Sequence, residues 1–259
     1  MIFDIPKQER IVALIEHGRG VIDICLSNDD RYFVSCGGDQ AIFLMGMSER
    51  KIRGRMKGHS NQIYTMDLSP DNIFLASGGM DQTCRIWDTR NMKQVHLLDD
   101  HEDTINGVAF SPNGKFLVTG SMDSNIIVYR TEDWAIHKKI IGRGWSTVYC
   151  PIISNAGNQV LFGADANVRI FDVETEEEIA NLAGHAKQVR CVCMTKDDRF
   201  AVSGAHDRTI RIWNLDRQVS IGKLVGHENF VITVALTPDD RTIVSSGSDR
   251  TVRLWDFED

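Results

Sequence analysis

A period of 42 residues runs through the sequence and constrains its fold more than any other feature. One lattice on this period carries histidines: His17, His59, His101, His185 and His227, with Arg143 at the missing point. A second lattice carries aspartates at every point: Asp39, Asp81, Asp123, Asp165, Asp207 and Asp249. A fixed period of this length indicates an array of similar supersecondary units, each stacked on its neighbours.

Each unit is predicted to consist of four short β-strands. In the second unit the expected strands are 63–68, 73–77, 83–87 and 94–98. Turn-forming glycine, proline and aspartate separate these runs, and no segment has a sustained helical period. Pro151 falls within the first strand of the fourth unit. Because proline cannot donate to a ladder on both sides, we expect the first strand of each unit to be an inner edge strand that lines a central channel.

Three units carry a strong motif: Gly58-His59 to Trp87-Asp88, Gly184-His185 to Trp213-Asn214, and Gly226-His227 to Trp255-Asp256. These motifs resemble the WD-repeat (WD40) β-propellers, and the resemblance covers nearly the whole chain. It implies a single all-β domain over 1–259, a six-bladed β-propeller of four-stranded antiparallel blades. The repeats are expected at about 17–56, 59–98, 101–140, 143–182, 185–224 and 227–256.

The last unit ends near Asp256 without an outer strand of its own. Residues 10–15 lie on the outer-strand lattice ahead of the first unit, so we expect them to pair with 251–256 and close the ring. A rival interpretation takes the chain as a piece of a longer array. It rests on Met1-Ile2-Phe3-Asp4, which echoes the third strand Arg85-Ile86-Trp87-Asp88.

Three units contain a histidine, a serine, an aspartate and a tryptophan at fixed spacing. The sets are His59, Ser77, Asp81 and Trp87; His185, Ser203, Asp207 and Trp213; His227, Ser245, Asp249 and Trp255. A single copy could suggest a Ser-His-Asp nucleophile. A catalytic triad needs only one copy, whereas this set occurs three times complete and twice in part. The resemblance implies a structural hydrogen-bonded set, so no residue is predicted to be catalytic and the protein is predicted not to be an enzyme.

No metal or cofactor site is predicted. Cys191 and Cys193 have no second pair at a zinc-like spacing and are interpreted as small packing residues. No phosphate-binding glycine loop with its lysine occurs. The net charge of −7 disfavours a dedicated nucleic-acid binder. No apolar run approaches a membrane span, and nothing near Met1 is typical of a signal peptide, so a cytoplasmic or nuclear location is expected.

The resemblance implies that protein or peptide partners, as in a multiprotein complex, bind at the mouth of the channel. Mapped onto this chain, the candidate partner-binding residues are Gln62, Tyr64, Met80, Met122, Trp145, Gln188, Arg190, His206 and Phe230. Methionine, aromatic residues and arginine are enriched at interfaces. The alternatives are packing of some aromatics between blades, an enzyme or small-molecule binder in the channel, and a substrate receptor of a cullin–RING ubiquitin ligase. The last rests on the box Asp81–Arg90, with Arg90 as its distinguishing adaptor-docking residue.

Overall fold

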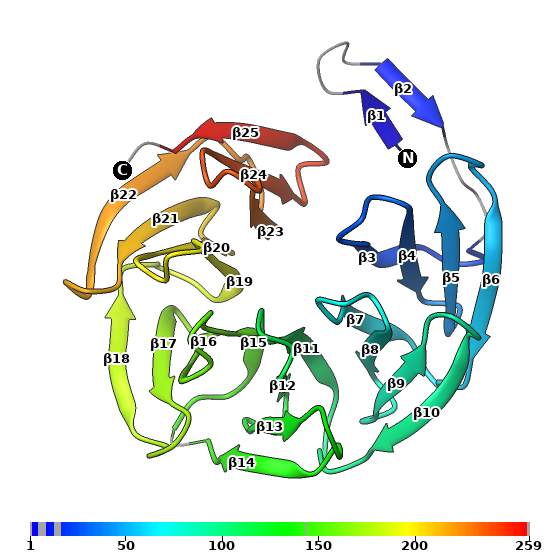
Figure 1. Ribbon diagram of the computed structural model, residues 1–259. Coiled ribbons are helices and arrows are strands. Elements are labelled where there is room, and N and C mark those ends of the chain that lie inside the picture. Colours follow the sequence, from blue (N-terminus) through cyan, green and yellow to red (C-terminus); the bar gives the residue numbers. More distant parts are fainter. Residues whose placement is uncertain (1, 5–8, 13–16, 143, 258–259) are drawn as a thin grey trace.

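The computed structural model describes residues 2–4, 9–12, 17–142 and 144–257. Its strands form five four-stranded sheets, one three-stranded sheet and one two-stranded sheet. The six larger sheets stand as blades around a central channel, as Figure 1 shows. No helix occurs among these residues. The protein is therefore an all-β, six-bladed propeller, as the repeat predicted.

The first three blades run from residue 21 to residue 140. Blade one contains β3 (Val21–Leu26), β4 (Tyr32–Gly37), β5 (Ala41–Gly46) and β6 (Ile52–Lys57). Blade two contains β7 (Ile63–Leu68), β8 (Phe74–Gly79), β9 (Cys84–Asp88) and β10 (Lys93–Leu98). Blade three contains β11 (Ile105–Phe110), β12 (Phe116–Ser121), β13 (Ile126–Arg130) and β14 (Ile136–Ile140).

The remaining blades follow the same order. Blade four contains β15 (Val148–Ile153), β16 (Gln159–Ala164), β17 (Asn167–Asp172) and β18 (Glu178–Ala183). Blade five contains β19 (Val189–Met194), β20 (Phe200–Ala205), β21 (Thr209–Asn214) and β22 (Val219–Val225). Blade six contains only β23 (Val231–Leu236), β24 (Thr242–Gly247) and β25 (Val252–Asp256).

In each blade the strands pair in chain order, with the first strand innermost (Figure 1). The predicted strands of the second unit agree with β7 to β10 within two residues at every end. Pro151 lies in the inner strand β15, where the register with β16 shifts between Tyr149 and Ile152. An inner strand has one unpaired edge, which explains why proline is tolerated there.

Five clusters of the core join two neighbouring blades each, and a sixth lies within blade one. One cluster packs Cys84 and Ile86 of β9 against Ile105 and Val108 of β11. The approach is close, because a Cβ on Gly78 would lie 2.5 Å from Ile105 Cγ2. Small residues on the second strand thus let the next blade seat its first apolar side chain. The rigidity of the ring comes from these sheet-on-sheet contacts.

The N-terminal residues do not form the predicted closing pair in the part of the chain that is described. The strand β2 (Glu9–Val12) pairs antiparallel with β1 (Ile2–Asp4), and β25 pairs only with β24 among the described strands. Figure 1 places the β1–β2 pair at the outer rim of the ring, next to an opening between blades six and one. Residues 13–15 of the expected closing strand lie outside the described residues, so closure stays a prediction.

Candidate channel-mouth face and buried hydrogen-bonded sets

The four polar side chains of blade two form one continuous chain of hydrogen bonds. His59 Nδ1 lies 2.9 Å from Asp81 Oδ2, and His59 Nε2 lies 2.7 Å from Ser77 Oγ. The indole N–H of Trp87 donates to Ser77 Oγ at 2.8 Å. With its proton on Nδ1, His59 donates to Asp81 and accepts the Ser77 hydroxyl proton on Nε2. Every polar atom in the set then has a partner.

The aspartate of this set accepts hydrogen bonds from several donors. Asp81 also accepts from Ser60 N at 3.0 Å and from Thr83 Oγ1 at 2.9 Å. Burial alone would raise the pKa of Asp81, but these bonds and the one from His59 outweigh it and hold that pKa well below its usual range. The carboxylate is therefore ionised at neutral pH, and its hydrogen bonds connect His59 and Ser60 to the turn that leads into β9.

The same arrangement recurs around the ring. Blades five and six repeat all four members: His185, Ser203, Asp207 and Trp213; His227, Ser245, Asp249 and Trp255. Blades one and three repeat it without an indole: His17, Ser35 and Asp39; His101, Thr119 and Asp123. In blade three, burial opposes the shift, but the bond from His101 and two backbone N–H groups lower the pKa of Asp123 to about 2.

The serines of these sets are closed to substrates. Ser77 and Ser203 are fully buried and Ser245 is 1% exposed. Each accepts the indole N–H of a tryptophan on the neighbouring third strand, which occupies a lone pair of the hydroxyl oxygen. A nucleophile must reach a substrate carbonyl beside an oxyanion site. These hydroxyl groups lie inside the blades and cannot make that approach.

At one end of the channel, a backbone bond brings two groups of predicted residues together. In most blades the residue before the turn aspartate donates its N–H to the carbonyl of the residue that precedes the inner strand. Met80 N thus bonds Gln62 O at 2.9 Å, and His206 N bonds Gln188 O at 2.8 Å. Met122, whose N–H bonds Thr104 O, follows the same rule. The turn residue of each blade therefore lies beside the start of its inner strand.

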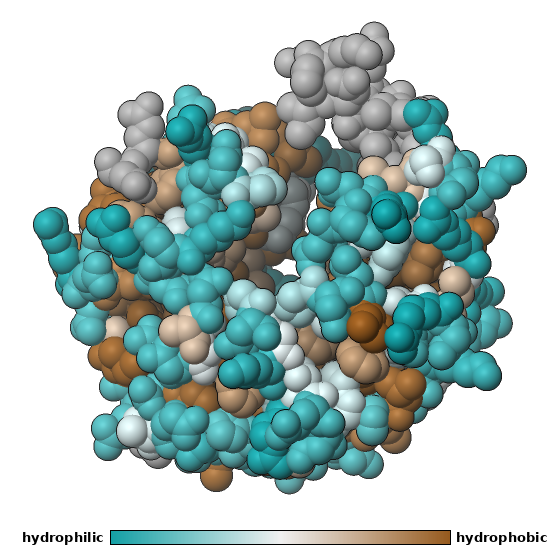
Figure 2. All heavy atoms as spheres, viewed as in Figure 1, coloured by the Kyte–Doolittle hydropathy of each residue, from teal (hydrophilic) through white to brown (hydrophobic). Residues whose placement is uncertain are grey.

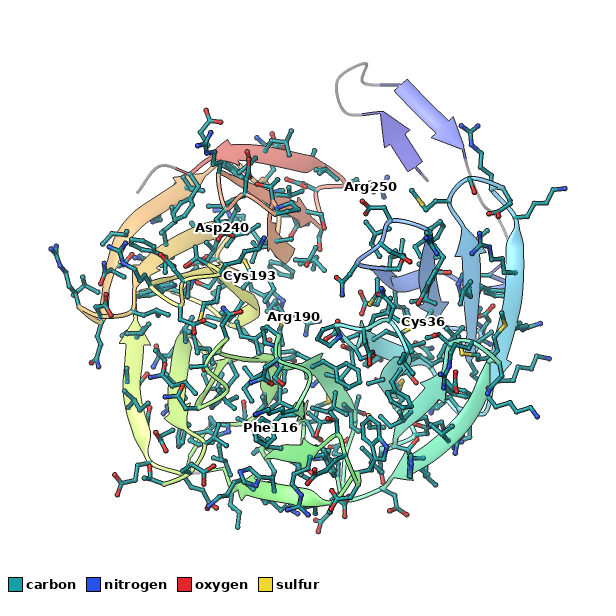
Figure 3. The ribbon with its side chains drawn as sticks, in the orientation of Figure 1. Cys36, Phe116, Arg190, Cys193, Asp240 and Arg250 are labelled. Atoms are coloured by element: carbon teal, nitrogen blue, oxygen red, sulfur yellow. The ribbon has the colours of Figure 1, made fainter. Side chains whose placement is uncertain are left out.

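Two contacts with aromatic rings position side chains at this end of the channel. The His206 ring stacks on Phe230 of the next blade, with centroids 4.2 Å apart and planes at 22°. The guanidinium of Arg190 lies 4.2 Å from the centre of the Tyr149 ring, and Figure 3 places Arg190 beside the channel. Burial lowers the pKa of His206, and the charges of Arg190 and Lys187 lower it further. His206 is thus kept neutral at physiological pH.

Several residues here are accessible. Met80, Met122 and Phe230 are 38%, 37% and 38% exposed, whereas Gln62 and Tyr64 are half-buried. We use the name channel-mouth face for Gln62, Tyr64, Met80, Met122, Gln188, Arg190, His206 and Phe230.

Trp145 does not belong to the channel-mouth face, contrary to the sequence-based expectation. Its side chain is 4% exposed and packs on Phe162 and Phe171. The indole N–H donates to Ser124 O in the preceding blade at 2.9 Å. The apolar pattern of blade four makes an interior site more favourable for this large ring than the surface.

Arg90 lies two residues after the end of β9, and its side chain is 66% exposed. Its guanidinium donates two hydrogen bonds to the Asp88 carboxylate, Nε to Oδ1 at 3.0 Å and Nη2 to Oδ2 at 2.7 Å. The bidentate pair lowers the pKa of Asp88 to about 2. The ion pair therefore links Arg90 to the end of the third strand.

Two carboxyl groups at the inner strands were missed by the sequence analysis. Asp23 Oδ2 accepts Met66 N at 2.8 Å, and Asp67 Oδ2 accepts Phe110 N at 2.7 Å, so each bonds the inner strand of the next blade. Burial raises the pKa of Asp23 to about 6 and that of Asp67 to about 7, although the N–H bonds oppose the shift. The only sequence signal was a carboxylate at strand positions where other units carry small residues.

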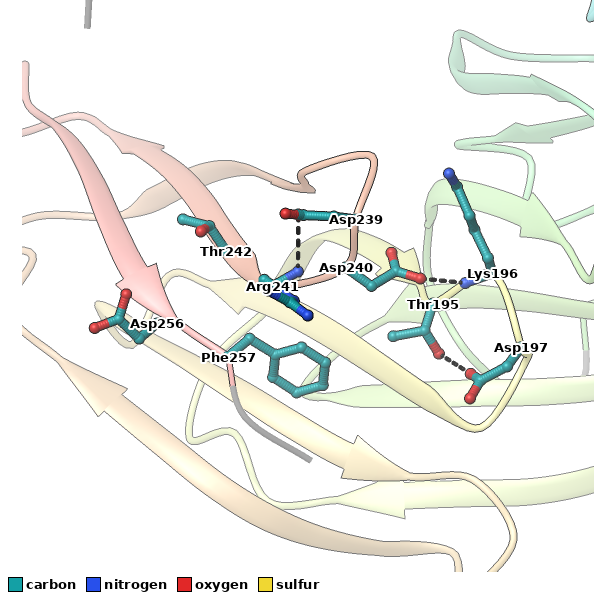
Figure 4. Close-up of a pocket in the computed structure, with 9 residues that line it drawn as sticks. All are labelled: Thr195, Lys196, Asp197, Asp239, Asp240, Arg241, Thr242, Asp256 and Phe257. Carbon is teal, nitrogen blue, oxygen red and sulfur yellow. Dashed lines mark hydrogen bonds between the residues drawn. The ribbon is translucent and has the colours of Figure 1, made fainter. Parts of the chain in front are cut away.

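A pocket of about 630 Å³ lies between blades five and six on the side of the strand-connecting turns. Figure 4 shows its lining, in which the Lys196 backbone N–H bonds Asp240 and Thr195 bonds Asp197. Phe257 forms one wall and packs edge-on against Phe200. The same backbone-to-carboxylate contact joins other neighbouring blades, as between Asn155 and Asp198. The hydrogen bond from Lys196 N to Asp240 in this pocket is thus of a kind that also joins other neighbouring blades.

Among the described residues, no group of three or more His, Cys, Asp or Glu side chains is placed to hold a metal ion. Cys191 is buried, and its thiol faces the Gly204 carbonyl at 3.6 Å. In the same part of the chain, no helix is long and apolar enough to cross a membrane.

The blade pattern has a match among known families. The family model for the WD domain, G-beta repeat (WD40) matches residues 8–44, 50–88, 92–130, 176–214 and 218–256, most of the chain. The chain belongs to the WD40 family. A search of curated proteins finds no match.

Each WD40 match begins one or two residues before a strand, namely β2, β6, β10, β18 or β22, and ends in the third strand of the blade that follows. No match falls between residues 131 and 175, the segment that contains β14 to β17. Blade four supplies β15 to β17. That blade carries Phe171 where three others carry the bonded tryptophan, and Leu161 at the serine position. WD40 propellers typically serve as protein-interaction scaffolds and are generally not enzymes.

Proposed function

We propose that this protein is a non-enzymatic scaffold that binds peptide or protein partners on its channel-mouth face. The observation that carries the proposal is the His206–Phe230 stack, which puts an aromatic surface of two blades beside the half-buried guanidinium of Arg190. Aromatic residues and arginine dominate the energetics of protein interfaces. Functional residues on loops held by a rigid ring are a common arrangement.

The buried sets fit this function as the frame of the face. Each set anchors the turn that precedes the third strand, through bonds such as Ser60 N to Asp81 and Thr83 Oγ1 to Asp81. The residue just before this aspartate is Met80, a member of the channel-mouth face. We infer that the sets orient the face and perform no chemistry.

The test compares two double variants by affinity purification and mass spectrometry. His206→Ala/Phe230→Ala alters the face, and Leu97→Ala/Ile179→Ala is the control, because these residues are 45% and 39% exposed on outer strands. We expect the first variant to lose specific partners that the wild type and the control retain. If both variants keep every partner, the face is wrongly assigned.

The second candidate function is a substrate receptor of a cullin–RING ubiquitin ligase that docks through the Asp81–Arg90 box. It is favoured by the largely exposed side chain of Arg90, whose guanidinium is held by two hydrogen bonds to Asp88. Arg90→Ala is expected to abolish capture of the ligase adaptor. The control is Arg130→Ala, since Arg130, the last residue of β13, donates two hydrogen bonds to the Asp133 carboxylate in the same way. Equal adaptor capture by all three proteins would exclude this function.

A further inference from the structure

The outer strand of blade one differs in charge from the other outer strands. Strand β6 and the residue before it carry cations at alternate positions, and all of them are exposed: Lys51, Arg53, Arg55 and Lys57. We use the name basic edge for these four residues. No acidic residue lies between residues 50 and 57, although the net charge of the chain is −7. Figure 1 places β6 at the outer rim of the ring, and Figure 2 shows hydrophilic side chains projecting from this rim.

The other outer strands of the complete blades expose apolar side chains instead. These are Val95 and Leu97 on β10, Ile136 on β14, Ile179 on β18, and Val219, Ile221 and Val225 on β22. Charged residues on an edge strand can serve to prevent pairing with other chains. If that were their role in this ring, the apolar outer strands would need such protection more than β6. The basic edge is therefore a local feature of blade one, and edge protection does not account for it.

The backbone of β6 has one free side. In the sheet order β3-β4-β5-β6 this strand pairs only with β5, so its outer edge has no strand partner among the described residues. Arg55 and Lys57 pair with alternate residues of β5, so both cations lie on one face. Alternate residues of a strand are about 6.6 Å apart. A second strand along this edge would therefore place its own alternate side chains beside these cations.

Two cations of the basic edge are held in place by contacts within blade one. Arg53 Nη2 donates to both carboxylate oxygens of Glu49, at 2.7 and 2.8 Å. The guanidinium of Arg55 lies 5.0 Å from the centre of the Phe43 ring. Among the described residues, Glu49 is the only acidic residue that pairs with the basic edge. Side chains that are already ordered lose less conformational freedom on binding, and the cations without an acidic partner favour an anionic one.

We propose that the basic edge binds an acidic segment of a partner protein, which adds to β6 as a strand with carboxylates at alternate positions. The cations supply charge complementarity, and the free edge supplies main-chain hydrogen bonds. Nucleic acid and anionic membranes fit less well, because the cations follow one narrow strand of a chain whose net charge is −7. The basic edge lies on the outer rim, apart from the channel-mouth face, so this proposal does not depend on the function proposed for that face.

The probe is a fluorescently labelled peptide of five Glu-Thr repeats, in which glutamate alternates with a residue that favours strands. Two control peptides have the same length: five Gln-Thr repeats, and five glutamates followed by five threonines. Binding to the full chain is measured by fluorescence anisotropy. The test variant is Arg55→Glu/Lys57→Glu. The control variant is Lys93→Glu/Lys223→Glu, which makes the same change in net charge at exposed residues of β10 and β22. Circular dichroism checks that both variants fold.

We expect saturable one-to-one binding of the Glu-Thr peptide, weakened at least about tenfold in the test variant and unchanged within about twofold in the control variant. The Gln-Thr peptide is expected not to bind, and the peptide with separate blocks of glutamate and threonine is expected to bind more weakly. Amide hydrogen exchange is expected to slow in β6 on binding and to stay unchanged in β22. His206→Ala/Phe230→Ala is expected to bind the peptide normally, which separates this site from the channel-mouth face.

Absence of binding to the wild type, or equal weakening in the two variants, would overturn the proposal. Equal binding of the alternating and block peptides, or unchanged hydrogen exchange in β6, would also overturn it, because charge alone would then account for the binding. Tighter binding of a single-stranded oligonucleotide or of phosphatidylserine vesicles, lost in the test variant, would assign the basic edge to a different class of ligand.

Discussion

Replacing Asp81 by alanine tests how much the buried sets stabilise the ring. The substitution removes the acceptor of His59 Nδ1, Ser60 N and Thr83 Oγ1 in one step. The His59 side chain is 0% exposed, so its N–H cannot turn to water. A buried donor left without a partner costs roughly 1–3 kcal/mol, and bonds to a charged group are at the upper end.

The expected loss for Asp81→Ala is therefore about 2–4 kcal/mol in the free energy of unfolding. Asp165→Ala is the matched control, because Asp165 stands at the same lattice position but is exposed. Among the described side chains it accepts only Ser146 Oγ, at 2.8 Å. Asp165→Ala is expected to lower the free energy of unfolding by less than about 1 kcal/mol, as for most exposed positions.

Urea unfolding of the three proteins at pH 7 measures both differences. The pH dependence supplies a second readout. The pKa of Asp81 is lowered in the folded state, so its stabilisation is present above the unfolded pKa of about 3.9 and is lost as the pH falls through the folded pKa. The gap between wild type and Asp81→Ala should narrow below about pH 4. Equal losses for the Asp81 and Asp165 variants at pH 7 would refute the argument.

Two further predictions concern residues that the structure revealed. Burial raises the pKa of Asp67 to about 7 in the folded state, so ionisation of this carboxyl destabilises the folded state as the pH rises from the unfolded pKa of 3.8 through 7. Asp67→Asn keeps an oxygen that accepts Phe110 N and does not ionise. The thermal midpoint of Asp67→Asn should therefore rise relative to that of the wild type between pH 4 and pH 8. Midpoint curves that stay parallel would contradict this. Trp145→Ala should cost about 3–5 kcal/mol in urea unfolding, as for other buried aromatic residues, whereas Phe230→Ala should cost under about 1 kcal/mol. Similar losses for both would place Trp145 at the surface.

The blade pattern could be predicted because each blade is built from local signals. The turn aspartates, the glycines and the alternating apolar runs lie within 42 residues of one another, and their spacing predicted β7 to β10 almost to the residue. The partners His59, Ser77 and Trp87 could likewise be grouped by recurrence, although only the coordinates give their bonds. The channel-mouth residues were also chosen from lattice positions, and the bond from Met80 N to Gln62 O explains why such positions meet.

The sequence by itself determined the all-β repeat, the number of blades and the polar sets, because these depend on short stretches of chain. Only the tertiary structure decided what happens between blades. It buried Trp145, it carried Asp67 across to Phe110 N, and it left Val21 and Val252 exposed at an opening. The physical reason is that an apolar residue in a strand has the same local pattern whether or not a second sheet covers it. Whether a residue is buried depends on whether a neighbouring blade covers it, and the period of 42 residues does not indicate whether the last blade has such a neighbour.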